Sequence, residues 1–158
     1  MNYYSIKDVA GSNDRYKIFL LNCNPENVDS SIDFLRENNI PVLNLGNNIA
    51  TFINTLDDYR YLNIDIYDFI IKLLEKNKAK IDKHGNDVLA VYNLGILLEP
   101  RLELNAVQLL KEFSKSSALI IIWENLVEFP GKLCWTTQQN NFLLDFSESP
   151  LKMLRYEI

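Results

Sequence analysis

The sequence predicts an α/β protein in which helices cover both faces of a mostly parallel sheet, a three-layer sandwich. Two uncharged apolar runs, residues 88–92 and Ala118–Trp123, are typical of strands that are buried on both faces. A long helical pattern precedes each run, as parallel strands with helical crossovers require. A further apolar run, residues 17–22, leads through a polar turn into a helical pattern and so begins the first strand–helix unit.

The helix after this first strand is predicted over residues 28–38, because its apolar residues recur at helical spacing. Residues 40–44 are predicted as the second strand, and Pro41 favours a place for it toward an edge of the sheet. Gly46 and the two asparagines after it indicate a turn.

Three more helical patterns follow along the chain. A short one covers residues 49–56, and a longer one covers residues 64–78, with Asn63 or Asp65 as its cap. A third runs from Asn105 to about Ser114, before the buried strand at Ala118–Trp123.

The C-terminal part predicts a hairpin of Lys132–Thr136 and residues 141–146 around a turn at 137–140, as an antiparallel addition at the C-terminal edge of the sheet. Residues 151–158 form a tail with alternating apolar residues. We expect an N-terminal arm over residues 1–16, with a short helical turn near residues 6–9, and a single domain over residues 17–158.

Composition limits the classes of function. The chain has 158 residues and a net charge of −5, which argues against broad nucleic-acid binding, since that binding rests on neutralising phosphates. The densest run of lysines, within residues 72–83, also contains acids and ends a predicted helix, so we interpret it as a solvated helix terminus. No apolar run approaches the roughly 20 residues of a membrane span, and the first residues do not resemble a signal peptide. By default we expect a cytoplasmic protein without membrane contact.

The cysteines and the histidine do not form a recognisable site. Cys23 and Cys134 lack the spacing of a metal site and are interpreted as buried or half-buried thiols. His84 is expected in a surface turn, and we predict no metal site. A nucleophilic role for Cys23 at a helix N-terminus is an alternative, although no basic partner is evident.

Ligands of parallel α/β proteins bind at the carboxyl ends of the strands. Here those ends are rich in amides, which form hydrogen bonds but neither transfer protons near neutral pH nor supply a nucleophile. We therefore predict no catalytic residue. If a nucleotide binds, its ligands are expected to be Asn22, Asn24, Ser30 and Asn93.

A phosphate-binding loop in the turn after the first strand would need glycines, a lysine and a serine or threonine. Cys23 and Val28 stand at the glycine places, and Asp29 stands at the lysine place, so only Ser30 fits. The strand at residues 88–92 ends in Tyr92 where an aspartate would orient Mg²⁺. We therefore expect no cofactor.

Several segments of the chain match a known pattern. An asparagine follows the strand at 88–92, then come an apolar run with proline, a helix with paired leucines that ends in serine, and an apolar strand ending in tryptophan. The positions concerned are Asn93, Ile96, Leu98, Pro100, Leu102, Leu109, Leu110, Ser114 and Trp123, with 42–44 before them and weaker matches at Pro150, Arg155 and Tyr156. In this order of elements, residues 17–156 resemble BrxF, the small P-loop protein family of the BREX phage-defence systems.

The resemblance implies a P-loop NTPase-like fold and a role in antiviral defence. It does not carry over nucleotide binding, because the chain departs from the family at the phosphate loop. The hypothesis that follows is a non-catalytic subunit or adaptor that contacts other protein subunits of a defence system, through residues 94–102, Tyr3 and Tyr4, with self-association left open. The alternatives are a nucleotide-binding protein or weak NTPase with an unusual loop, and nucleic-acid binding through residues 72–83, which we do not expect.

Overall fold

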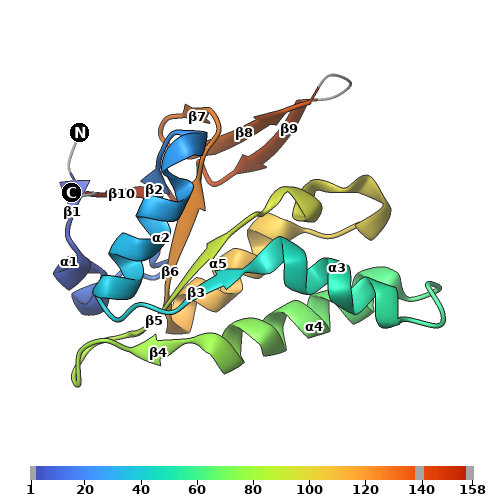
Figure 1. Cartoon of the computed structure of the whole chain (residues 1–158), viewed down its shortest axis with the longest axis horizontal. Helices are drawn as coiled ribbons and strands as arrows, with labels where there is room; N and C mark the ends of the chain where they lie inside the picture. The colour runs from blue at the N-terminus through green and yellow to red at the C-terminus, as the bar shows by residue number, and fades with distance from the viewer. Residues whose placement is uncertain (1–2, 138–140, 156–158) are drawn as a thin grey trace.

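A computed structural model describes residues 3–137 and 141–155. Its centre is a seven-stranded sheet in the order β1–β10–β2–β6–β5–β3, with β4 beside β5 (Figure 1). All the pairings are parallel except that of β4 with β5. The strands are β1 Tyr3–Tyr4, β2 Ile18–Asn22, β3 Val42–Asn44, β4 Ala79–Lys80, β5 Asp87–Tyr92, β6 Ala118–Trp123 and β10 Lys152–Leu154. The prediction of an α/β protein with a mostly parallel sheet is confirmed, as is the edge position of β3.

The predicted hairpin exists but forms a sheet of its own. β7 (Val127–Glu128), β8 (Lys132–Thr136) and β9 (Asn141–Asp145) are antiparallel and do not pair with the central sheet. The edge of the central sheet is instead taken by β10 and β1, which are parallel to β2. The inward residues of the hairpin are apolar and pack on the core, which explains why the hairpin lies over a face of the sheet. Of the predicted turn, residues 138–140 lie outside the described residues, as do residues 156–158 of the tail.

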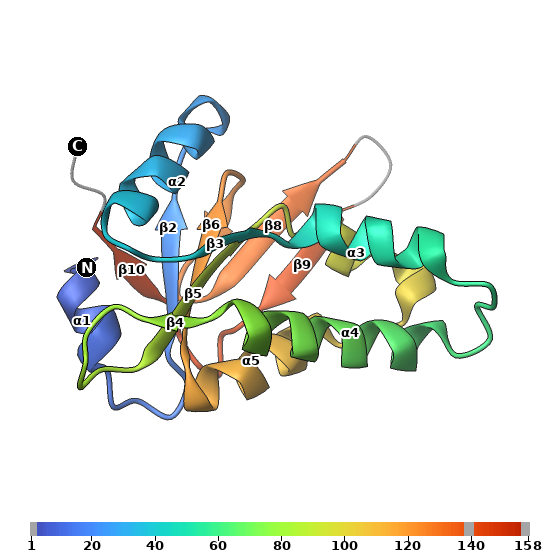
Figure 2. The same ribbon diagram turned by 60° about the horizontal axis from the view of Figure 1, so that its bottom comes forward.

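The helices follow the predicted order. They are α1 Ile6–Gly11, α2 Val28–Glu37, α3 Leu45–Thr55, α4 Leu62–Asn77 and α5 Ala106–Ser116, with short 3₁₀ turns η1 Pro25–Asn27, η2 Gly95–Leu98 and η3 Pro100–Leu102. In both views α3 and α4 run side by side away from the sheet (Figures 1 and 2). No helix in the described ranges has the length and apolar character needed to cross a bilayer.

Two predicted helix starts were wrong. Gly46 and the asparagines after it lie in the first turn of α3 rather than in a separate turn, because the Asn44 side chain caps this helix by accepting from the backbone N–H of Asn47 at 3.0 Å. α4 begins after Tyr61, and neither Asn63 nor Asp65 caps it. The N–H of Asp65 donates to the Tyr61 carbonyl at 2.9 Å, so Asp65 is already inside the helix.

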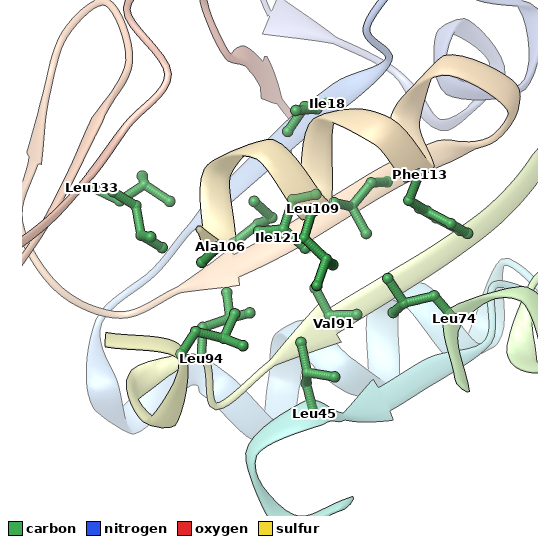
Figure 3. Packing of buried hydrophobic residues seen from close by; sticks show 14 of the residues in the cluster. Ile18, Leu45, Leu74, Val91, Leu94, Ala106, Leu109, Phe113, Ile121 and Leu133 are labelled. Atoms are coloured by element: carbon green, nitrogen blue, oxygen red, sulfur yellow. The ribbon is translucent and has the colours of Figure 1, made fainter. Parts of the chain in front are cut away.

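Both faces of the central sheet are covered by helices. α1 and α2 bury Val9, Ile32 and Leu35 on one face. α3, α4, α5 and the second sheet cover the other face, where Leu109 and Phe113 of α5 lie over the strands (Figure 3). Because both faces are buried, the interior strands are mainly apolar, with Asn22 and Asp87 only at strand ends, and all six residues of β6 are buried.

Candidate functional site

The carboxyl ends of β2 and β6 form the point where the chain leaves the sheet toward opposite faces. β2 is followed by α2 on one face, whereas β6 is followed by the second sheet on the other face. In open α/β sheets a ligand crevice lies at such a topological switch point. The turn that sequence analysis selected, at the start of α2, is therefore at the expected place.

Asn22 uses its side chain to join the two strands at this point. Its Nδ2 donates to the Trp123 carbonyl at 2.8 Å and to the Asn125 carbonyl at 3.2 Å, and the next N–H, that of Cys23, donates to the same Trp123 carbonyl at 3.0 Å. The donors of the Asn22 amide are thus used within the protein. A ligand at the switch point would have to compete with both bonds.

Asn93 and Asn44 make a second internal contact, at the ends of β5 and β3. The Asn93 Nδ2 donates to the Asn44 Oδ1 at 2.9 Å, the same oxygen that caps α3. Asn93 has a positive φ of 60°, a conformation that asparagine tolerates better than most residues. A Cβ on Gly46 would lie only 2.4 Å from the Asn93 carbonyl oxygen, so glycine is needed for this close approach.

The predicted ligands therefore do not converge. Asn93 lies with Asn44, while Asn22 bonds to the strand beside it. Asn24 and Ser30 are both exposed, one at the start of η1 and the other in α2. The sequence predicts the correct edge of the sheet but not the hydrogen bonds that these amides form within the protein.

The charges at this edge are unfavourable for phosphate. Glu26 is exposed in η1, and Asp29 lies exposed in the first turn of α2. Residues 22–31, 44–48, 92–98 and 123–127, which follow the four strands, contain no lysine, arginine or histidine. A carboxylate about 4 Å from a phosphate charge repels it by roughly 1 kcal/mol in water and by more where water is excluded.

The environment of Cys23 makes its thiol less acidic. Burial raises the pKa of the Cys23 thiol; the Ser31 hydroxyl opposes this rise and the Glu124 carboxylate adds to it. A raised pKa means less thiolate at a given pH, and the thiolate is the nucleophilic form. The alternative of a nucleophilic Cys23 is therefore disfavoured.

We expect Cys23 to react several-fold more slowly with iodoacetamide in the folded protein than in urea at pH 8, because less thiolate forms and the sulfur is half-buried. A Cys134→Ser variant makes Cys23 the single reporter, and mass spectrometry follows the reaction. A folded rate above the unfolded rate, with a midpoint below that of a free thiol, would show an activated cysteine instead.

A hollow of about 750 Å³ lies beside η2 and η3, just beyond the end of β5. Ile96 and Leu98 of the predicted contact segment line it, together with aromatic side chains from two distant segments, Tyr59 before α4 and Trp135 and Phe142 from the hairpin. Leu94 and Leu97 of residues 94–102 are buried in the core, and Leu102 is buried as well although it also borders the hollow. The sequence does not reveal the aromatic wall, because only the tertiary fold brings these segments together.

The other candidate residues from the sequence lie in environments that indicate a structural role. His84 is exposed in a turn, as predicted, and both cysteines are half-buried and free. At the lysine-rich end of α4, Lys78 forms ion pairs with Glu75 at 2.5 Å and with Asp87 at 3.6 Å, and Glu75 raises the pKa of the Lys78 ammonium. Within residues 3–137 and 141–155, no three acidic, cysteine or histidine side chains gather as a metal site would need.

Comparisons with protein-family models, with curated proteins and with solved structures found no match for this chain. The fold and the site themselves define a protein of the α/β class. Its central sheet is mostly parallel, and the segments that follow β2, β3, β5 and β6 are rich in asparagine and contain no basic residue.

Proposed function

We propose that this protein is a non-catalytic, P-loop-like subunit or adaptor of a multi-protein bacterial anti-phage defence system that acts through protein–protein contacts. The observation that carries the non-catalytic part is the use of the Asn22 amide to join β2 to the segment after β6, at the place where phosphate would sit. The resemblance of residues 17–156 to the BrxF family carries the defence role.

The P-loop-like character is supported by the surroundings of β2. It is an interior strand, and its carboxyl end leads through a turn to the N-terminus of α2 at the switch point of the sheet. P-loop proteins hold phosphate at this kind of junction. Asp29 stands at the position where a phosphate-binding loop has its lysine, and this difference supports an adaptor rather than an NTPase.

The hollow beside η2 and η3 supports contact with a protein. Its wall is mainly apolar and aromatic. Tyr59 lines the hollow and has 56% of its own surface exposed. Aromatic side chains are enriched at protein interfaces and carry much of their binding energy. Tyr3 is exposed as well, whereas Tyr4 is half-buried and packs edge-on against Phe19.

We expect no change in Tm when millimolar Mg-ATP is added to the purified protein, because a ligand that binds the folded state must stabilise it by mass action. Differential scanning fluorimetry measures this directly. A saturable rise in Tm that a Ser30→Ala change abolishes would instead support the nucleotide-binding alternative.

Co-expression with the products of neighbouring genes tests the adaptor role itself. We expect a stable complex, and we expect Ile96→Asp at the hollow to lower its yield. Leu143→Asp is the matched control, since Leu143 points outward from β9 and does not line this hollow. A protein that remains alone at micromolar concentration with all of these products would overturn the proposal.

A further inference from the structure

Three cations gather around one aromatic ring at the end of the sheet opposite the carboxyl edge. Tyr16 precedes β2, and its ring lies below the Lys111 ammonium at 4.6 Å, the Arg15 guanidinium at 5.2 Å and the Lys115 ammonium at 5.9 Å from the ring centroid. Cations within about 6 Å of a ring are attracted to its face. We call Arg15, Tyr16, Lys111 and Lys115 the Tyr16 cluster.

The positive charge of the Tyr16 cluster is only partly compensated. Glu112 pairs with Lys115 at 2.8 Å, and the charge of Arg15 also acts on Glu112 from farther away. Among the residues that the structure describes, Arg15 and Lys111 have no carboxylate within ion-pair distance. The buried Lys17 adds a positive charge close by, because its Nζ donates to the Lys115 carbonyl at 2.7 Å.

A groove of about 670 Å³ adjoins this cluster and shares Arg15 and Tyr16 with it. The apolar part of its wall comes from Tyr4, Phe129, Pro130, Pro150, Leu151 and Met153. Its charged groups besides Arg15 are Asp14 and Lys152, which pair with each other, and Glu148. The surface therefore combines an apolar groove with a positive end.

We propose that the groove and the Tyr16 cluster bind an extended acidic segment of a partner protein. Apolar side chains of the segment enter the groove, and its carboxylates pair with Arg15 and Lys111. This assignment rests on the proposed function as an adaptor and names the chemistry of one partner surface. The complementary charge is the reason for this choice: the whole protein carries −5, yet Arg15 and Lys111, which form no ion pair among the described residues, lie together at the Tyr16 ring beside this groove.

A protein segment fits this surface better than a nucleic acid does. Single-stranded nucleic acids bind by stacking bases on open aromatic faces, whereas the Tyr16 ring already has cations over it. The net negative charge, with exposed carboxylates at Asp29, Asp33 and Glu37 along α2, also repels a long polyanion. A short acidic segment would contact only the Tyr16 cluster and its neighbourhood, where the local charge is positive.

Selection from a phage-displayed library of random peptides, with the full chain as bait, tests the proposal. We expect the selected peptides to be rich in aspartate, glutamate and apolar residues. The best of them, synthesised with a fluorophore, should bind the Arg15→Glu/Lys111→Glu variant about tenfold more weakly by fluorescence anisotropy, and binding should weaken as salt is raised. The matched control is Lys72→Glu/Lys76→Glu, which changes the net charge equally on the exposed side of α4 and should leave the affinity unchanged.

Circular dichroism first checks that both double variants are folded, and Lys111→Gln replaces the first if it is not. Selected peptides without acidic residues, no selected peptide at all, or equal loss in both double variants would overturn the proposal. So would binding of oligodeoxythymidine that only the Arg15→Glu/Lys111→Glu variant loses, since the surface would then serve a nucleic acid. These outcomes are separate from failure of the proposed function, because assembly with the neighbouring gene products is measured on its own.

Discussion

Replacing Leu144 with alanine is expected to lower the free energy of unfolding by about 2–5 kcal/mol. Leu144 of β9 is 3% exposed and opposite Leu133 of β8, which is fully buried in the same core (Figure 3 shows Leu133). Alanine removes buried methyl groups and leaves a cavity where the second sheet packs on the central one. Urea unfolding followed by circular dichroism gives the value.

The neighbouring residue supplies the control for this prediction. Leu143 lies on the opposite face of the same strand and is 48% exposed, so Leu143→Ala should change stability by no more than about 0.5 kcal/mol. Equal effects of the two substitutions would mean that the second sheet is not part of the domain core. A large effect at Leu143 alone would reverse the assignment of the two faces.

The periodicity of the sequence was sufficient to predict the long elements. β6 was predicted with its observed bounds, because a run of six apolar residues is typical of a strand that is buried on both faces. β1 and β10 were missed, since runs of two and three residues carry no pattern of their own. Their place in the sheet is fixed by pairing with each other and with β2, which are contacts between the two ends of the chain.

The same limit explains which features of the candidate site the sequence predicts and which it does not. The sequence correctly predicts an edge rich in asparagine, because strand ends can be read locally. It does not show that Asn22 bonds to a carbonyl about a hundred residues away or that Asn93 bonds to Asn44. The Tyr16 cluster was missed for the same reason, since Arg15 and Lys111 lie in different parts of the chain, and only the hydrogen-bonded contact of the end of α5 with Lys17 brings them to one ring.

Gly46→Ala is expected to lower the free energy of unfolding by about 1–3 kcal/mol through overpacking. Alanine is the better helix former by about 1 kcal/mol, so helix propensity alone would predict a rise in the free energy of unfolding. The new methyl group, however, would lie 2.4 Å from the Asn93 carbonyl oxygen and 2.7 Å from its Nδ2. Because the nearest atom belongs to the backbone at the end of β5, a side-chain rotation cannot relieve the contact.

Gly11→Ala separates these two effects. Gly11 ends α1, is exposed, and has no atom within 4 Å of an added Cβ, so alanine there should raise stability by about 0.4–1 kcal/mol by restricting the unfolded chain. Urea unfolding of the two variants should therefore give changes of opposite sign. A stabilising Gly46→Ala would mean that α3 can move away from β5 at little cost, and that the contact between Asn44 and Asn93 does not hold this edge of the sheet in one conformation.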